Sequence, residues 1–95
     1  MQSEKETEAF LRDEVKRLGG RSYKWVSPGR VGVPDRIVIA PGGKVVFAEL
    51  KSEGRTSSEQ QKRFQAELGA LGCTVYRDID TKEKVREMLR EVFAT

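Results

Sequence analysis

The sequence predicts an α/β domain in which a mixed central sheet is flanked by helices, with the element order αβββαβα. Three observations lead to this class. Amphipathic helical patterns open, interrupt and close the chain, and short runs rich in β-branched residues lie between them. The 95 residues are enough for a single domain, residues 1–95. Because a helical pattern separates the last two strand patterns, we expect those strands to pair in parallel through a right-handed crossover.

The first expected helix covers residues 7–18. Its apolar side chains Leu11, Val15 and Leu18 have the i, i+4, i+7 spacing of one helical face, and two glycines follow. A short strand is then expected at residues 23–26.

A β-hairpin is expected in the middle of the chain. Residues 27–34, SPGRVGVP, contain two glycines and two prolines and predict a turn-rich loop. The strand patterns DRIVIA at 35–40 and VVFAELK at 45–51 flank the tight reversal PGGK at 41–44. The second strand is apolar on both faces before its charged end, which indicates a central strand.

The second half predicts a helix within residues 56–72, a strand at 73–79 and a helix at 80–93. Serine and threonine precede the first of these helices as N-cap candidates, and Asp80 or Thr81 precedes the second. The expected inward positions are Phe64, Leu68 and Leu71 in one helix and Val85, Met88, Leu89 and Val92 in the other.

Composition excludes several classes of function. No apolar run approaches the ~20 residues of a membrane span, and the charged N-terminus lacks the apolar core of a signal peptide. The absence of histidine disfavours zinc sites and Ser-His catalysis. The single cysteine, Cys73, cannot form an internal disulfide, so we expect a reducing cytoplasm and a small buried core residue.

Three charged residues are expected to meet at the open end of the hairpin. Pairing about the turn brings Asp35 opposite Glu49 and Lys51, and the latter two share one strand face because side chains alternate. Two adjacent carboxylates repel, and a divalent cation such as Mg²⁺ would relieve this repulsion. The Leu50 carbonyl is a further candidate ligand, and the Lys51 ammonium could act on a metal-bound water or a phosphate.

The alternative is an ordinary ion pair, since an E-x-K pattern on a strand is most often a solvated surface pair. The Gly/Pro loop before Asp35 and the apolar strand before Glu49 favour a site instead. Glu8 offers a third carboxylate on the apolar stripe of the first helix. Glu8 could alternatively be present only because the dipole at the first turn of a helix favours acidic residues.

Basic residues gather in the middle of the chain and suggest a surface that faces a polyanion. The candidates for phosphate contacts are Lys24, Arg30, Arg36 and Arg55. Ordinary solvated surface charge is the alternative for all four. The aromatic pair Tyr23 and Trp25 could stack on an unpaired base, but packing in the core is the preferred interpretation.

The stretch GVPDRIVIAPGGKVVFAELK resembles the PD-(D/E)xK nuclease signature: Pro34-Asp35, thirteen residues, then Glu49-Leu50-Lys51. The whole chain more narrowly resembles the VRR-NUC group, the virus-type replication-repair nucleases. Four further features carry this resemblance: a glutamate in the first helix, the KWVSPGRVGVPDRIV lead-in, an early glutamine in the next helix, and LGCTVYRDID before the last helix.

The resemblance implies a restriction-endonuclease-like fold and a set of site residues. It makes Asp35 and Glu49 metal ligands, with Leu50 lending its carbonyl, and it makes Lys51 the catalytic lysine. It implies that Mg²⁺ or Mn²⁺ is the cofactor.

Two positions of the family pattern allow alternatives. The helix carboxylate falls on Glu8, which shares the Leu11 face, while Glu4 competes with it nearer the chain start. The family glutamine falls on Gln61 or on Gln60; Gln61 is preferred because it lies three residues before Phe64.

The resemblance also implies the activity and the partners. We expect a metal-dependent DNA endonuclease, selective for junction or branched replication and repair DNA, that acts as a homodimer in the cytoplasm of a bacterial or virus-infected host cell. The alternative functions are a non-catalytic DNA-binding module of the same fold and a domain that is active only within a larger assembly.

Overall fold

The computed structural model describes residues 1–94, and its helices and strands follow the expected order αβββαβα. They are α1 (Glu4–Arg17), β1 (Arg21–Lys24), β2 (Arg36–Ala40), β3 (Lys44–Leu50), α2 (Glu59–Ala70), β4 (Val75–Ile79) and α3 (Lys82–Val92).

The four strands form one mixed sheet in the order β1-β2-β3-β4. β1 pairs with β2 and β2 with β3 in the antiparallel sense, whereas β3 pairs with β4 in parallel. The expected hairpin, the central position of β3 and the parallel pairing after the crossover are therefore confirmed. The register places Arg36 opposite Ala48, so Asp35 lies beside the end of β3.

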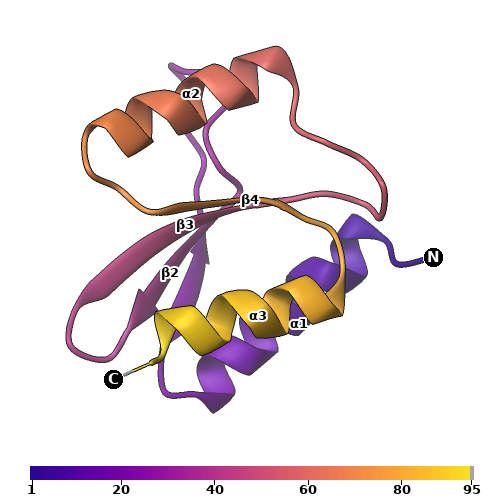
Figure 1. The fold of residues 1–95 in the computed structure, drawn as a ribbon, viewed down its shortest axis with the longest axis vertical. Coiled ribbons are helices and arrows are strands. Elements are labelled where there is room, and N and C mark those ends of the chain that lie inside the picture. Colours follow the sequence, from indigo (N-terminus) through magenta and orange to yellow (C-terminus); the bar gives the residue numbers. More distant parts are fainter. Residues whose placement is uncertain (95) are drawn as a thin grey trace.

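Helices cover both faces of the sheet: α1 and α3 lie side by side on one face, and α2 lies on the other (Figure 1). The main core fills the space between the sheet and the α1/α3 pair. It consists of Leu11, Val15, Val38, Ala40, Val46, Ala48, Leu50, Ile79, Val85, Met88, Leu89 and Val92. All four inward positions expected in the last helix are confirmed, because they recur on one face of α3.

The first helix begins earlier than the sequence pattern predicted. Ser3 is its N-cap, with the side-chain oxygen accepting a hydrogen bond from the backbone N–H of Glu6 at 3.1 Å. The helix therefore begins at Glu4, whereas the sequence pattern placed its first residue at Thr7. Leu18 was expected on the inward face, but it is the C-cap and is exposed, because the helix ends at Arg17.

Three further residues differ from expectation. Leu71 lies just after α2 and is 77% exposed, and Cys73 is only partly buried in the loop before β4. Tyr23 is 55% exposed on the edge strand β1, so it does not pack in the core. Trp25 lies after β1, and its ring packs against Phe47 and Phe64 at centroid distances of 5.2 and 5.8 Å, which confirms its structural role.

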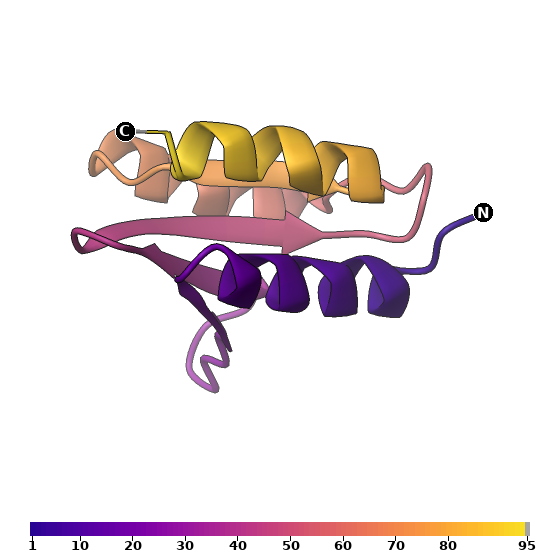
Figure 2. The same cartoon turned by 90° about the horizontal axis from the view of Figure 1, so that it is seen from below.

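One end of the sheet gathers several chain segments. In Figure 2, the arrowhead of β3 points toward the side on which α1 begins. β2 starts at this end because it runs antiparallel to β3. The first turn of α2 also reaches this end, since Gln61 contacts Glu49 and Lys51. None of the helices in residues 1–94 is long and apolar enough to cross a membrane.

Candidate active site

Asp35 and Glu49 are brought together by the register of β2 and β3. Asp35 immediately precedes β2, and its Oδ2 accepts a hydrogen bond from the backbone N–H of Leu50 at 2.8 Å. This bond fixes the carboxylate beside the end of β3. Pro34 is fully buried before it, which anchors the loop that delivers Asp35. Glu49 itself is 0% exposed, an unusual location for a carboxylate.

The Glu49 carboxyl group has too few hydrogen-bond donors for an ionised state. Its Oε2 accepts from Gln61, but its buried Oε1 accepts no hydrogen bond from residues 1–94. Burial, followed by hydrogen-bonding contact with the Asp35 carboxyl and by its negative charge, raises the pKa of Glu49 to about 9. Lys51 opposes this shift only in part. The Asp35 and Glu49 carboxyl groups therefore have too little positive charge around them, and a bound cation would stabilise their ionised forms.

Lys51 lies on the same side as Glu49, as side-chain alternation predicted. Its Nζ lies 3.9 Å from Glu49 Oε2 and donates a hydrogen bond to Gln61 Oε1 at 2.8 Å. Gln61 Nε2 donates in turn to Glu49 Oε2 at 3.2 Å. The Gln61 amide therefore joins the ammonium to the carboxylate. Gln60, the alternative, is exposed, and the contacts to Lys51 and Glu49 found within residues 1–94 come from Gln61.

The N-terminus of α2 fixes the Gln61 side chain. Ser58 is the N-cap, its Oγ accepts from the backbone N–H of Gln61, and its own N–H donates to Gln61 Oε1 at 2.8 Å. The Gly/Pro loop packs on the same turn: a Cβ at Gly32 would lie 2.8 Å from the Gln60 carbonyl oxygen, and its φ of +92° also favours glycine. The loop before Asp35 is thus seated against the turn that holds Gln61.

The two helix glutamates have different surroundings. Burial and the negative charges of Asp35 and Glu8 raise the pKa of Glu4, and Lys51 opposes them, which places Glu4 within electrostatic range of the site. Glu8 Oε2 instead accepts a hydrogen bond from Arg36 Nε at 3.1 Å. The Ser3 cap is the sequence signal that favours Glu4, because a helix starting there brings Glu4 into its first turn.

The four candidate phosphate-binding residues are placed differently from one another. Lys24 and Arg55 are exposed. Arg30 bridges to Glu67 at 3.1 Å, and its guanidinium lies 4.5 Å from the centroid of the Phe64 ring. Arg36, the first residue of β2, is only 8% exposed, and its side chain is paired with Glu8 of α1 and does not lie on the outer surface.

The site offers an open set of ligands for a divalent ion. Among residues 1–94, no group of three Asp, Glu, Cys or His side chains forms a closed metal cage. Mg²⁺ does not require one, because it commonly binds one or two carboxylates and retains waters. The buried Glu49 Oε1, which accepts no hydrogen bond from residues 1–94, lies beside Asp35 and fits such an ion, and the Leu50 carbonyl follows Glu49 directly in the sequence.

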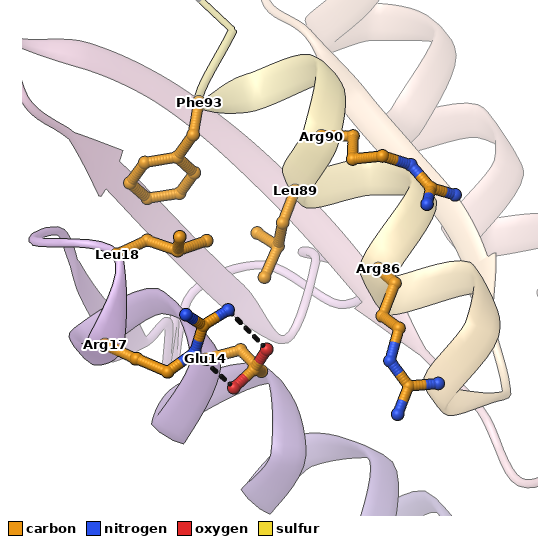
Figure 3. Close-up of a pocket in the computed structure, with 7 residues that line it drawn as sticks. All are labelled: Glu14, Arg17, Leu18, Arg86, Leu89, Arg90 and Phe93. Atoms are coloured by element: carbon orange, nitrogen blue, oxygen red, sulfur yellow. Dashed lines mark hydrogen bonds and ion pairs between the residues drawn. The ribbon is translucent and has the colours of Figure 1, made fainter.

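A pocket between the C-terminal halves of α1 and α3 lies apart from these residues (Figure 3). It is lined by Glu14, Arg17, Leu18, Arg86, Leu89, Arg90 and Phe93. Its carboxylate, Glu14, is paired with Arg17 through two hydrogen bonds of 3.0 and 3.1 Å. This pocket contains no carboxylate pair, and none of the proposed site residues lines it.

The order of elements and the mixed four-stranded sheet define a domain of restriction-endonuclease-like fold, with Asp35, Glu49 and Lys51 gathered at one end of the sheet. A solved structure described as a VRR_NUC domain superposes with a TM-score of 0.86 at 25% identity, covering 95% of this chain and 97% of that chain. "Putative nuclease p44" of Acyrthosiphon pisum secondary endosymbiont phage 1 is 50% identical over 68 residues, 72% of this chain and 73% of the relative. No family model matches the chain. The chain belongs to the VRR-NUC family of nucleases.

Proposed function

We propose that the chain is an endodeoxyribonuclease that requires Mg²⁺ or Mn²⁺. The observation that carries the metal requirement is the buried Glu49 Oε1, which accepts no hydrogen bond from residues 1–94 and lies in a carboxyl group that contacts Asp35. An ionised carboxylate pair in this position is stable only with a compensating cation. Asp35 and Glu49 would bind that cation together with the Leu50 carbonyl.

The bound ion would polarise the scissile phosphate and lower the pKa of a coordinated water. The protein residues supply orientation and charge. Lys51 Nζ, held 2.8 Å from Gln61 Oε1, has further protons to donate to the attacking water or to a phosphate oxygen. Glu4, in the first turn of α1, supplies a carboxylate that can hold a metal-bound water. Glu8 serves the site through its ion pair with Arg36.

The exposed basic residues Lys24 and Arg55 are the proposed contacts to DNA phosphates, together with Arg30 on the Gly/Pro loop. Exposed apolar side chains accompany them, since Tyr23 and Val26 are exposed near the same loop. Tyr23 could therefore stack on an unpaired base, which supports a preference for branched or junction DNA. A homodimer is proposed because one site cuts one strand, and a two-fold pair of sites cuts two.

A cleavage panel tests the proposal. Linear duplex, flap, splayed and four-way-junction DNA would be incubated with the protein in Mg²⁺, in Mn²⁺ and in EDTA. We expect cleavage only with metal, and faster cleavage of the branched substrates. Cleavage in EDTA would contradict the metal requirement, and equal rates on all substrates would contradict structure selectivity. Sedimentation velocity with and without junction DNA would test the homodimer.

A further inference from the structure

Gln2, two residues before Glu4, is bonded to two segments that are distant in sequence. Its backbone N–H donates to Glu53 Oε1 at 2.8 Å, and its carbonyl accepts from the Glu53 N–H at 3.0 Å. Its side-chain Oε1 also accepts from the Lys82 N–H, at the start of α3, at 2.7 Å. The reciprocal pair of Gln2–Glu53 hydrogen bonds is called the N-terminal bridge below.

The N-terminal bridge links the two chain segments that deliver site residues. On one side, Gln2 lies two residues before Glu4; on the other, Glu53 lies two residues after Lys51. With so few intervening bonds, the bridge limits how far the first turn of α1 can move from the end of β3. Helix termini otherwise fray most readily, so this turn needs such a restraint to keep a side chain in place.

The Glu53 segment is itself held from the opposite side. The Gly54 N–H donates to Asp80 Oδ2 at 2.8 Å, and the Lys51 N–H donates to the Ile79 carbonyl at 3.1 Å. The turn after Lys51 is therefore attached to β4 and the residues that follow it. A rigid anchor of this kind can position α1, whereas a mobile loop could not.

We propose that Glu53 is a positioning residue: through the N-terminal bridge it holds the first turn of α1 so that Glu4 faces the metal site. This inference rests on the proposed function, since it concerns affinity for the divalent ion. Glu53 is not expected to touch the metal or the DNA. Its effect passes through Glu4, as outer partners of a metal site commonly act by orienting a side chain nearer the ion.

Two substitutions of Glu53 separate the hydrogen bond from the charge. Glu53→Gln removes the charge and keeps an acceptor for the Gln2 N–H. Glu53→Asp keeps the charge but is shorter by one methylene, so it loses that bond. Gln2→Ala is the matched control, because both bonds of the bridge use the Gln2 backbone and this variant loses only the side-chain contacts with Lys82 and Glu83 at the start of α3.

The measurement is Mn²⁺ binding by isothermal titration calorimetry without DNA, with circular dichroism to confirm folding. We expect Glu53→Asp to weaken Mn²⁺ binding about tenfold, and Glu53→Gln and Gln2→Ala to change it less than about twofold. If Glu53→Gln weakens Mn²⁺ binding while Glu53→Asp does not, the effect is one of charge, and the inference fails. Equal losses in both variants would show that keeping an acceptor for the Gln2 N–H does not preserve Mn²⁺ binding, which also overturns the inference. A loss of Mn²⁺ affinity in Gln2→Ala as large as that in Glu53→Asp would also overturn the inference, since a general loss of α1 anchoring would then be the cause.

A double-mutant cycle tests whether the bridge acts through Glu4. In a Glu4→Gln background, Glu53→Asp should have little further effect on Mn²⁺ affinity; two independent, additive losses would overturn the inference. Wild-type protein is the reference for the function itself. If it binds no Mn²⁺ and cuts no DNA, the proposed function has failed; if it does both while Glu53→Asp matches it, only the positioning role has failed.

Discussion

Replacing Glu49 by glutamine should stabilise the metal-free protein at neutral pH. The wild-type carboxyl is buried, it contacts a second carboxyl, and one of its oxygens accepts no hydrogen bond from residues 1–94. A glutamine has nearly the same shape as a protonated glutamic acid. Its amide can donate toward Asp35 while its oxygen accepts from Gln61, so both neighbours remain bonded.

The magnitude follows from the pKa of Glu49, which the fold raises from 4.5 to about 9. Below pH 4.5, the Glu49 carboxyl is protonated in both the folded and the unfolded state, and its contribution to the free energy of unfolding is at its maximum. That contribution is lost as the pH rises toward 9, at about 1.4 kcal/mol per pH unit. Between pH 4.5 and 7 the loss is on the order of 2–3 kcal/mol. Glu49→Gln does not titrate, so its advantage should be small at pH 5 and large at pH 8.

The assay is urea unfolding in EDTA at pH 5, 7 and 8, followed by circular dichroism. In saturating Mg²⁺, the wild-type protein should become more stable than Glu49→Gln, because ligand binding to the folded state stabilises only the protein that binds the ion. Glu8→Gln is the matched control: it takes the charge from the partner of the buried Arg36 and should destabilise by about 1–2 kcal/mol. If Glu49→Gln destabilises the metal-free protein equally at pH 5 and pH 8, ionisation of the buried Glu49 carboxyl does not lower the stability of the fold.

Four further outcomes follow from the site. Lys51→Ala should abolish cleavage in a gel assay while the circular dichroism spectrum stays unchanged; wild-type cutting would remove Lys51 from the mechanism. Asp35→Asn should weaken Mg²⁺ binding in calorimetry, and unchanged affinity would contradict its role as a ligand. Gly32→Ala should lower the free energy of unfolding in urea by about 1–3 kcal/mol and slow cleavage, because the φ of +92° and the Gln60 carbonyl both oppose a Cβ. An unchanged free energy of unfolding and cleavage rate would show that the loop accommodates the methyl group without strain. The DNA dissociation constant should rise steeply with salt, and a flat response would argue against phosphate contacts.

The sequence predicted best what depends on neighbours along the chain. The turn residues PGGK set the hairpin register, and that register alone brings Asp35 beside Glu49, as expected. Strand alternation predicted that Glu49 and Lys51 share a face, and the 3.9 Å separation agrees. The helical period identified the buried face of α3 for the same reason: a local geometric repeat determines which side chains point together.

The sequence was less informative at the ends of elements. Leu18 and Leu71 continue the helical spacing, yet each falls on the residue after its helix and is exposed. The start of α1 was placed too late because the residues before it are polar, although Ser3 is a favourable cap. Periodicity locates the middle of a helix well, but capping and local packing decide its last turn.

The charged residues that meet across different elements were not predictable before the fold was known. From the sequence, Glu8 and Arg36 were candidates for separate roles, whereas the fold pairs them with each other. It places Glu4 in range of Asp35, and it joins Gln61 to Lys51 and Glu49. The family signature and the hairpin that presents it could be identified from local sequence alone. Partner choice among charges depends on the docking of α1 and α2 onto the sheet, which no local repeat specifies.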